Sequence, residues 1–328
     1  MFSSYIHHLK SQPTWILFLS SLGLLSVLKL TFSLIKWVFI LLLRPPRNLK
    51  AQYGPWAVVT GATDGIGKAF AVELAKTGLN LILTSRSADK LESLSRDIQT
   101  RYPNTQIRVV AVDFSDDIAI VESSAAAAAE GVEVGVVVNN VGVTYTAARY
   151  FDEVEEEVWR RVVRVNLEGT TRVTRALLPG MVKRRRGAIV NIGSGAGIVV
   201  PSHPLFAVYA ATKAYVDQLS RCLYVEYKQF GIDVHCQVPL YVSTKMASKI
   251  ASIDKPSFFV PSAYDYAHAA VRRIGYEARC TPYWTHSIQW FFASLLPEGV
   301  LNSWRLAVGI RRRGKVVAET GFVSPPIK

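Results

Sequence analysis

One stretch, residues 194–213, carries side chains that suit proton transfer to a carbonyl oxygen. Tyr209 and Lys213 are four residues apart in a helical pattern, so their side chains share one face, about a turn apart. A phenol has a pKa near ~10 and is a poor acid–base catalyst at neutral pH, but a neighbouring ammonium group lowers that pKa. Ser194, which follows an apolar run typical of a buried strand, adds a hydroxyl group. The stretch contains no source of hydride, so the rest of the chain must supply one.

A glycine-rich turn, placed between an apolar strand and an amphipathic helix, has the composition of a phosphate-binding loop. Glycine permits a tight turn and lets the backbone approach a pyrophosphate at the helix N-terminus. The spacing differs from the GxGxxG pattern of dinucleotide-binding folds but meets the same physical need. The residues predicted to bind phosphate here are Gly61, Thr63, Asp64, Gly65, Ile66 and Gly67.

The end of the second predicted strand indicates which dinucleotide binds. A carboxylate at this place would bind the ribose 2′-hydroxyl of NAD. The chain instead has Arg86, 19 residues beyond Gly67, and an arginine suits a 2′-phosphate. NADPH is therefore the predicted cofactor. The alternatives are that Arg86 is an ordinary surface residue, or that Asp89 contacts the ribose.

Strand-like and helix-like segments alternate through the middle of the chain. This alternation predicts an α/β fold with a doubly wound parallel sheet. The predicted strands are residues 57–60, 79–84, 107–112, 132–139, 188–192 and 232–238, and the predicted helices are residues 69–77, 90–102, 118–130, 153–183 and 209–230.

Beyond about Lys245 the alternation stops and a C-terminal helical extension is predicted. A helix is expected over residues 257–273, and aromatic, apolar segments follow at residues 286–300 and 304–310. Such segments flanked by arginines suit either a lid over an apolar substrate or a helix on a membrane surface. Ordinary packing of the helices on the domain is the third interpretation.

The N-terminal segment has the composition of a membrane anchor. Residues 14–43 are almost wholly apolar. Residues 11–28 form an uncharged run of 18 residues, close to the ~20 that span a bilayer. The length of the apolar segment and the lack of a small-residue cleavage site argue against a secretory signal peptide. Arg44, Arg47 and Lys50 follow the segment and Lys10 precedes it, so the downstream domain is expected on the cytosolic side. One span and a tight pair of short helices both fit.

Charge and cysteine content restrict the classes of partner. The chain has 38 Lys and Arg against 25 Asp and Glu, a net charge of +13, which favours anionic partners such as membrane surfaces or phosphorylated ligands. Nucleic acid is not a predicted partner, because the sequence has no RNA-binding signature, zinc-finger spacing or long basic tail. Three cysteines without a CxxC pair indicate a reducing compartment and no metal site.

Taken together, these motifs resemble the short-chain dehydrogenase/reductase family, whose fold is a Rossmann-type doubly wound sheet. The glycine loop resembles the cofactor loop of that family, residues 139–142 (Asn-Asn-Val-Gly) its NNxG strand end, and Tyr209 with Lys213 its catalytic pair. The motifs occur in family order between Tyr53 and Met246.

The resemblance implies a role for each matching residue. Tyr209 would be the general acid, Lys213 would lower its pKa and hold the nicotinamide ribose, and Ser194 would bind the substrate oxygen. The resemblance further assigns a water-positioning role to Asn166, and cofactor contacts to Asp113 (adenine), Asn140 and Thr244 (nicotinamide carboxamide).

Three positions depart from the family pattern. Val141 replaces an alanine, and Leu240 replaces the glycine that commonly follows Pro239, which leaves the shape of that loop open. Ser194 lies 15 residues before Tyr209, where 12 or 13 is usual, so the intervening loop must bulge.

The whole chain further resembles the membrane-bound very-long-chain 3-oxoacyl-CoA reductases, above all those of plants. The shared features are the anchor and the runs at residues 191–195, 215–217 and 237–242. The resemblance implies NADPH-dependent reduction of a long-chain 3-oxoacyl-CoA to the 3-hydroxyacyl-CoA at the endoplasmic reticulum membrane, with a cytosolic catalytic domain. The implied partners in fatty-acid elongation are a condensing enzyme, a dehydratase and an enoyl reductase.

Two functions other than acyl-CoA reduction stay open. One is a membrane-bound 17β-hydroxysteroid or other lipid-ketone oxidoreductase; the other is a non-catalytic membrane scaffold, against which the intact Ser194, Tyr209 and Lys213 argue. The expected organisation is an anchor and linker over residues 1–50, an NADPH-binding catalytic domain over 51–250, and the C-terminal extension, as lid or membrane-associated segment, over 251–328.

Overall fold

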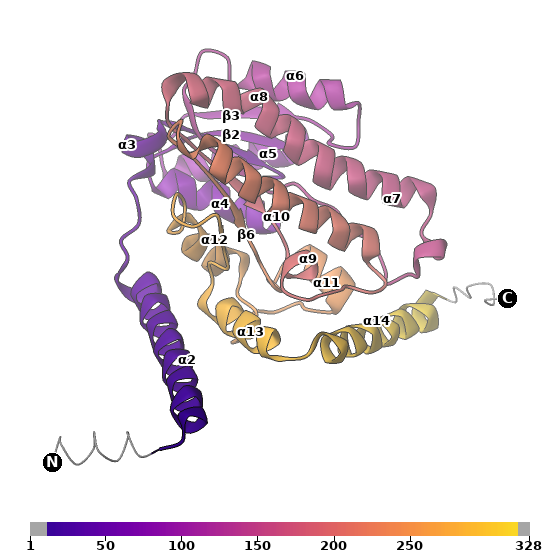
Figure 1. The fold of residues 1–328 in the computed structure, drawn as a ribbon. Helices are drawn as coiled ribbons and strands as arrows, with labels where there is room; N and C mark the ends of the chain where they lie inside the picture. Colours follow the sequence, from indigo (N-terminus) through magenta and orange to yellow (C-terminus); the bar gives the residue numbers. More distant parts are fainter. Residues whose placement is uncertain (1–11, 321–328) are drawn as a thin grey trace. The chain divides into compact units, whose positions relative to one another are not determined.

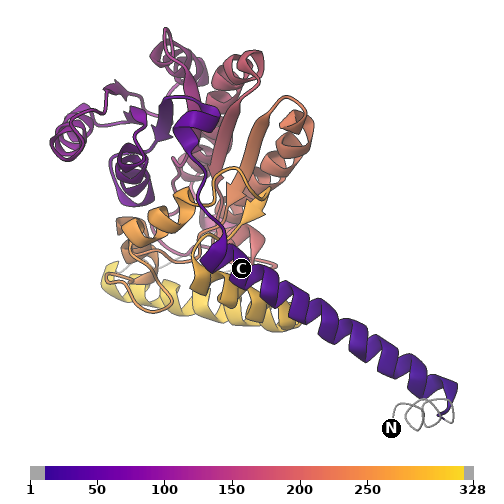
Figure 2. The same ribbon diagram turned by 90° about the vertical axis from the view of Figure 1, so that its left-hand side faces the viewer.

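The computed structural model of this protein describes residues 12–320, and the chain divides into two compact units, one up to Pro45 and one from Pro46 onward. In the first unit, α2 (Thr14–Val38) continues without a break into a π-helical turn, η1 (Phe39–Leu43), and the views of Figures 1 and 2 show a single helix. At ~1.5 Å per residue its 30 residues extend about 45 Å, more than the ~30 Å of a bilayer core.

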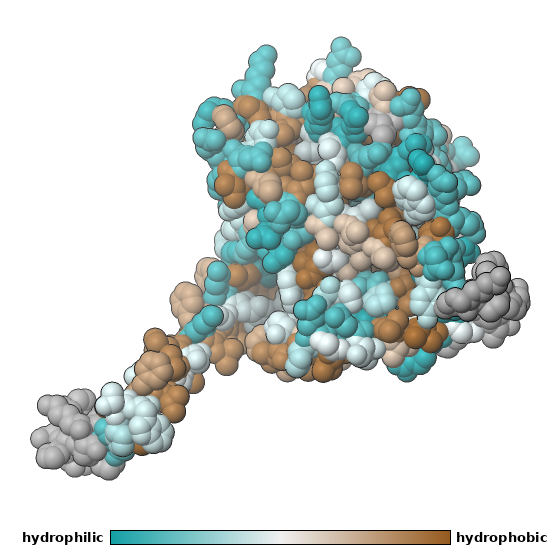
Figure 3. Space-filling view, turned by 45° about the vertical axis from the view of Figure 1, so that its right-hand side comes forward, coloured by the Kyte–Doolittle hydropathy of each residue, from teal (hydrophilic) through white to brown (hydrophobic). Residues whose placement is uncertain are grey.

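The surface of this helix is mainly apolar, with hydrophobic residues interspersed with paler and hydrophilic ones in Figure 3, and none of its residues is buried by the rest of the unit. It is therefore a candidate membrane anchor made of one helix rather than a pair of short ones. Lys10, which the charge comparison used, lies outside the described residues.

The second unit is built on a parallel sheet of seven strands in the order β3-β2-β1-β4-β5-β6-β7. The strands are β1 (Trp56–Thr60), β2 (Asn80–Ser85), β3 (Ile107–Ala111), β4 (Val134–Asn139), β5 (Gly187–Ile192), β6 (Ile232–Gln237) and β7 (Arg279–Cys280). All six predicted strands are confirmed, and the doubly wound sheet with them. The strand order reverses between β1 and β4, which is where such sheets form their ligand-binding crevice.

Helices cover both faces of the sheet (Figure 1). One face carries α4 (Gly65–Lys76), α5 (Ala88–Arg101) and α12 (Ala263–Val271); the other carries α6 (Ile118–Ala128), α7 (Glu156–Val163), α8 (Gly169–Arg184) and α10 (Ala207–Lys228). The remaining elements are α3 (Leu49–Tyr53), η2 (Phe151–Glu153), α9 (Gly195–Ile198), α11 (Lys245–Ala251), α13 (Trp284–Leu295) and α14 (Glu298–Thr320).

Two predicted helices differ from the structure. The single helix expected over residues 153–183 is interrupted by a π-helical turn, η3 (Arg164–Glu168), between α7 and α8. A π-turn adds one residue to the turn and is frequent at functional sites. The helix expected over residues 257–273 spans only α12, because the residues before it form isolated bridges instead.

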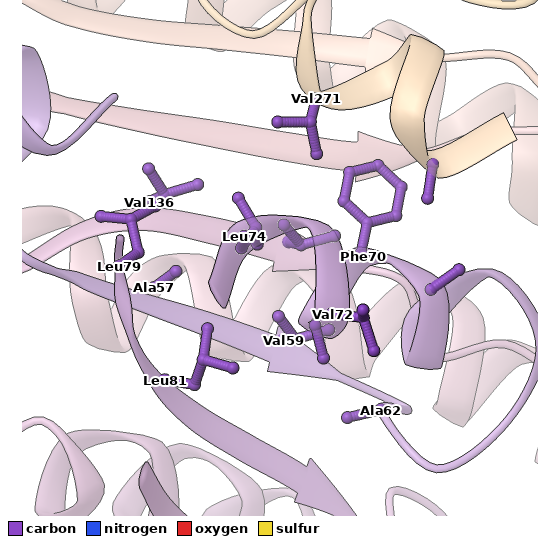
Figure 4. Close-up of a cluster of buried hydrophobic side chains, with 14 of the residues drawn as sticks. Ala57, Val59, Ala62, Phe70, Val72, Leu74, Leu79, Leu81, Val136 and Val271 are labelled. Atoms are coloured by element: carbon purple, nitrogen blue, oxygen red, sulfur yellow. The ribbon is translucent and has the colours of Figure 1, made fainter. Parts of the chain in front are cut away.

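The core follows the alternation of side chains along each strand. Figure 4 shows Val59 of β1 and Leu81 of β2 on the face covered by α4, where they pack with Phe70 and Leu74. Val58, the neighbour of Val59, points to the opposite face and belongs to a second cluster. Each fully buried aliphatic side chain contributes about 1.5–3 kcal/mol, so the two layers fix the strand ends firmly in place.

A buried carboxylate fastens the segment through which the chain enters this unit. Asp233, at the start of β6, accepts a hydrogen bond from the Tyr53 hydroxyl (2.6 Å) and one from the Lys228 ammonium group (2.6 Å). Arg47 lies 3.4 Å from the same carboxylate, whose side chain is only 8% exposed. Burial raises the pKa of Tyr53, so its hydroxyl remains a donor. These contacts tie the chain before β1 to the far side of the sheet.

We expect Asp233→Asn to lower the free energy of unfolding by about 2–4 kcal/mol, because it removes the buried negative charge that accepts hydrogen bonds from Tyr53, Lys228 and Arg47. Thermal or urea unfolding of the detergent-solubilised full chain measures the change. The matched control is Asp97→Asn, which removes an exposed ion pair with Arg101 and should change stability by less than about 1 kcal/mol. Equal effects of both substitutions would show that the buried cluster does not hold this segment.

Candidate active site

A cleft of about 470 Å³ opens at the carboxyl ends of β1, β4 and β5, where the strand order reverses. It is lined by the glycine loop before α4, the ends of β4 and β5, residues of α10, the segment after β6, and side chains of α13 and α14. Both ribbon views place α13 and α14 at the same end of the unit as α9 and α11 (Figures 1 and 2). Three of the sequence-predicted catalytic residues, Ser194, Tyr209 and Lys213, therefore share one cleft with the glycine loop.

Ser194 and Tyr209 are in contact despite their long separation in sequence. Their side chains form a hydrogen bond, and the Ser194 hydroxyl also accepts one from the Ala196 N–H at the start of α9 (3.2 Å). The extra residues form α9 and a loop in which Leu205 adopts a left-handed conformation (φ 66°), unfavourable for a branched residue. The Leu205 carbonyl accepts a hydrogen bond from the Arg149 N–H, which holds this bulge in place.

The Tyr209 phenol is held in its protonated form. Burial raises its pKa, against the lowering effect of the Ser194 hydrogen bond, and nearby Tyr241 raises it further. Lys213 is not among the causes of this shift, so the lowering of the Tyr209 pKa by Lys213 stays a prediction. Lys213 donates its hydrogen bond to the Ile192 carbonyl instead (2.8 Å), and the removal of water around the phenol outweighs other influences.

Lys213 is itself an unusual residue, a lysine that is only 6% exposed. Burial lowers the pKa of its ammonium group to about 8, and the opposing influence of the Cys236 thiol is smaller. The group is thus still mainly charged at neutral pH, but it gives up its proton far more readily than a surface lysine.

Asn166 lies in the π-turn η3, is 1% exposed, and has its amide group fully engaged. Its oxygen accepts a hydrogen bond from the Val143 N–H (2.8 Å), while its NH₂ donates to the Val143 carbonyl (2.9 Å) and the Thr212 hydroxyl (3.1 Å). A Cβ added to Gly142 would lie 3.4 Å from the Lys213 nitrogen and 3.5 Å from the Asn166 oxygen. Lys213 and Asn166 therefore border the same small space, which a larger residue at 142 would narrow.

The glycines of the cofactor loop are required by its backbone and by its packing. Gly61 (φ 63°) and Gly65 (φ 51°) adopt left-handed conformations. A Cβ on Gly67 would lie 2.3 Å from the Gly61 carbonyl oxygen and 2.4 Å from the Asn140 amide nitrogen. That amide donates to the carbonyls of Thr60 (3.0 Å) and Gly61 (3.3 Å), so Asn140 holds the loop in shape.

The loop meets the segment after β6 across the cleft. Asp64 caps α4 by accepting from the Gly65 N–H (2.8 Å), and its carboxylate lies 3.0 Å from the Lys245 ammonium group. The methyl group of Thr244 lies 3.1 Å from where a Cβ on Gly65 would stand. Ile66 also lines the cleft. The N-terminus of α4 and Thr244 therefore lie close to each other in the cleft.

Polar groups gather at the ends of β1, β2 and β3. The Thr63 hydroxyl hydrogen-bonds the Ser85 hydroxyl (2.8 Å). Arg86 is 68% exposed and lies 3.9 Å from Asp113, so Asp113 rather than Asp89 is the acid beside it. Partial burial raises the pKa of Asp113, but two hydrogen bonds from Ser115 and the charge of Arg86 hold it below its ordinary value.

These features fit a nicotinamide dinucleotide. The left-handed glycines bare the N-terminus of α4 to a pyrophosphate, and the absent side chains at Gly65 and Gly142 leave room that a Cβ would fill. Thr244, Tyr209 and Lys213 line the cleft, whereas Arg86 and Asp113, which follow β2 and β3, are not among its lining residues, so their contacts with an adenosine stay a prediction.

The segment after β6 tolerates Leu240 where a glycine is usual. Leu240 is not among the described residues with a positive φ, and its N–H donates to His286 Nδ1 (3.3 Å). Burial lowers the pKa of His286 to about 4, so the neutral ring can accept from Leu240 and donate to the Tyr241 carbonyl (3.1 Å). The Leu240 side chain packs on Gly195, where a Cβ would lie 2.2 Å from it.

Four cleft residues were not foreseen from the sequence: His203, Tyr241, Arg305 and Arg312. In the sequence, Arg312 was interpreted only as part of the arginine flank of the apolar segment at residues 304–310, and Arg305 was not singled out. Their spacing of seven, two helical turns, was the available signal that both lie on one face of α14.

Residues 55–254 match the short chain dehydrogenase family. A very-long-chain 3-oxoacyl-CoA reductase-like protein of Arabidopsis thaliana is 56% identical over 93% of this chain and 97% of its own length. The very-long-chain 3-oxoacyl-CoA reductase of Rattus norvegicus is 42% identical over 76% of this chain and 78% of its own.

Two further comparisons bear on catalysis and on the cofactor. An inactive hydroxysteroid dehydrogenase-like protein of Homo sapiens is 42% identical, covering 81% of this chain and 80% of that protein. A short-chain dehydrogenase from Sphingobium yanoikuyae, solved in complex with NADPH, superposes with a TM-score of 0.62 at 28% identity and covers 76% of this chain and 95% of that one. With its sheet, glycine loop and Ser–Tyr–Lys cleft, the chain is a nicotinamide-dependent oxidoreductase of the short-chain dehydrogenase family.

Proposed function

We propose that this protein reduces very-long-chain 3-oxoacyl-CoA to 3-hydroxyacyl-CoA with NADPH. The observation that carries the proposal is the cleft itself, which joins the Ser194–Tyr209 pair to a dinucleotide loop on one side and to side chains of α13 and α14 on the other. The reductases named among the relatives supply the substrate class.

The residues of the chain divide the chemistry among them. Ser194 and Tyr209 hold the C3 carbonyl oxygen, and the cofactor, when bound, supplies the hydride that C3 accepts. Tyr209 donates its proton to the oxygen, which becomes the 3-hydroxyl group. The raised pKa of Tyr209 suits a donor, because the phenol is protonated when the substrate arrives. Lys213 and Asn166, which border one space at Gly142, stabilise the resulting phenolate and return a proton to it.

The apolar substrate gives a reason for the anchor and the C-terminal helices. A very-long-chain acyl group partitions into a bilayer, so an enzyme tethered there meets its substrate at high local concentration. We infer an endoplasmic reticulum membrane and a cytosolic catalytic unit from the basic residues after the apolar helix. The partners in this proposal are a condensing enzyme that supplies the 3-oxoacyl-CoA, a dehydratase that consumes the product, and an enoyl reductase.

The C-terminal extension, residues 251–328, would act as both lid and membrane-associated surface as far as it is described. Gln289, Ala293 and Trp304 line the cleft, whereas Phe292 and Leu295 of the same region are 61% and 62% exposed. Hydrophobic residues are visible along this end of the unit in Figure 3. An apolar surface beside the cleft would let an acyl chain pass from lipid to the active site without crossing water.

A non-catalytic role is the second candidate, and the similarity to an inactive relative is the observation that favours it. Against it, the Ser194–Tyr209 hydrogen bond and the buried Lys213 are present, and a buried lysine is a destabilising feature that a scaffold does not need. A lipid ketone or steroid as substrate would use the same residues.

Tyr209→Phe should lower kcat by about 10²–10⁴-fold, because it removes the proton donor. NADPH oxidation by the detergent-solubilised protein, with 3-oxoacyl-CoA of graded chain length, measures this. Tyr264→Phe, on the exposed side of α12, is the matched control. A wild-type protein that oxidises NADPH with steroid ketones but with no 3-oxoacyl-CoA would overturn the substrate. Full complementation of elongation by Tyr209→Phe would favour the scaffold.

Arg86→Asp should lower kcat/KM for NADPH by about tenfold to a hundredfold and leave that for NADH nearly unchanged or improved. A charge-assisted hydrogen bond to the 2′-phosphate is worth about 1.5–3 kcal/mol, and NADH lacks that phosphate. Steady-state kinetics with both cofactors measure the ratio, with exposed Arg96→Asp on α5 as the control. Equal losses for NADPH and NADH would remove Arg86 from this role.

Lys213→Met should abolish activity yet stabilise the fold by about 2 kcal/mol at pH 7. The pKa of Lys213 is about 8 in the folded protein and 10.5 in the unfolded chain, so the charged lysine lowers the free energy of unfolding by about 3 kcal/mol below pH 8. Methionine removes this penalty but also loses the hydrogen bond to Ile192, which is worth about 1 kcal/mol. Between pH 8 and 10.5 Lys213 is protonated in the unfolded chain but not in the folded protein, so the stability of the wild type rises with pH over this range. The difference in stability between the variant and the wild type therefore closes from about pH 8 to 10.5.

Denaturant unfolding at a series of pH values checks the gap. Lys90→Met, on exposed α5, reports the effect of the lysine-to-methionine exchange itself. A Lys213→Met variant less stable than the wild type at pH 7 would contradict the inference that burial disfavours the charge.

A further inference from the structure

Two arginines of α14 line the catalytic cleft with no acid beside them. Arg305 is 7% exposed, its Nε has no hydrogen-bond partner, and both Arg305 and Arg312 line the cleft. Among the residues that the structure describes, no carboxylate lies within ion-pair distance of either guanidinium group. The same helix shows that such an acid is available elsewhere, since Arg313 forms an ion pair with Glu153.

The neighbours of the two arginines are a histidine and a tyrosine rather than an acid. Arg305 lies 2.7 Å from the His203 ring, and burial together with the two arginines lowers the pKa of His203 to about 3, so this ring is neutral. Arg312 donates to the Tyr241 hydroxyl (2.7 Å) and lies over the same ring, 5.3 Å from its centroid. Burial raises the pKa of the Tyr241 phenol, but the charges of Arg305 and Arg312 outweigh this and hold that pKa below its ordinary value. A buried cation, Arg305, and a half-buried one, Arg312, thus share one wall with a neutral histidine and a phenol but with no carboxylate.

This arrangement is unfavourable unless something else is bound there. A charge removed from water without a counter-charge destabilises a fold by several kcal/mol, and two like charges in one wall repel each other. Guanidinium groups recognise oxygen acceptors in a fork geometry, most strongly phosphate and carboxylate oxygens. The wall therefore has the chemistry of a site for an electron-rich oxygen.

The location of the wall points to the substrate rather than the cofactor. The cofactor pyrophosphate belongs at the glycine loop between β1 and α4, whereas the arginines belong to α14. Tyr241, the partner of Arg312, lies near enough to Tyr209 to shift its pKa. The arginines thus reach the cleft next to the group that donates the proton.

We propose that Arg305 and Arg312 form a subsite that binds an electron-rich oxygen in the polar head of the substrate. This proposal rests on the proposed function, and it places the arginines at the thioester end of an acyl-CoA. The oxygen that they bind is either the C1 carbonyl oxygen, two carbons from the reacting C3, or an oxygen of the CoA phosphates. The subsite would distinguish acyl thioesters from lipid ketones that have no polar group beside the ketone, and it would fix which end of the acyl chain enters first.

The test compares Arg305→Gln and Arg312→Gln with wild type on three substrates: a 3-oxoacyl-CoA, the same acyl group on phosphate-free N-acetylcysteamine, and a long-chain ketone without a thioester. We expect kcat/KM to fall about tenfold to a hundredfold for thioesters, as for loss of a charge-assisted hydrogen bond, and to stay unchanged for the plain ketone. A loss with both thioesters assigns the arginines to the C1 carbonyl; a loss with the CoA ester alone assigns them to its phosphates.

Stability separates this role from a structural one. Because Arg305→Gln removes a buried charge that has no acid beside it, and Arg312→Gln a half-buried one, we expect the variants to unfold at the same temperature as the wild type or higher, whereas a structural arginine would lower it. Arg311→Gln, one residue from Arg312 but exposed, is the control.

The proposal is overturned if the variants lose activity equally on all three substrates, if they lose none, or if they unfold at clearly lower temperatures. A wild-type protein that reduces only the plain ketone would instead overturn the proposed function, which keeps the two failures distinct.

Discussion

The geometry of the site depends on a chain of buried hydrogen bonds that joins the two central strands to α10. Asn139 of β4 donates to the Asn191 side chain of β5 (2.8 Å), and Asn191 donates to the Ser220 hydroxyl of α10 (2.9 Å). Buried amides have fixed donor and acceptor ends, so they tolerate only one register. This chain of bonds sets the height of α10 against the sheet, and with it the reach of Tyr209 and Lys213 over the strand ends.

Much of this was predictable from the sequence because it is local. Apolar runs of strand length, a glycine turn before an amphipathic helix, and a Tyr–Lys spacing of four are properties of neighbouring residues, and the six longer strands followed from them. What was missed depends on contacts between distant segments. The two-residue β7 has no periodicity to detect, and the π-turn around Asn166 lies in a stretch whose pattern continues as helix. The raised pKa of Tyr209 has the same origin, since burial is a property of the assembled cleft.

The unfavourable features of the molecule are concentrated around the cleft. Lys213 is a buried ammonium group, Arg305 and Arg312 are cations without acids, and Leu205 occupies a left-handed conformation. Elsewhere a buried charge is balanced, as at Asp233, which three hydrogen-bond donors surround. A fold tolerates such local costs when the surrounding core is well packed, and the two hydrophobic layers on the sheet provide that packing.

The charged and polar groups of the cleft favour the development of negative charge on a substrate oxygen. A neutral phenol and a lysine with a depressed pKa stabilise negative charge on oxygen at the moment when a carbonyl becomes an alkoxide, and two arginines without acids add positive charge to the same cleft. The same cations would disfavour a substrate that brings positive charge, and a site with low dielectric strengthens both effects. Reduction of a carbonyl on an otherwise apolar molecule fits this distribution of charge. The apolar part of such a molecule can contact the hydrophobic surface of α13 and α14, and only its oxygens need the cations.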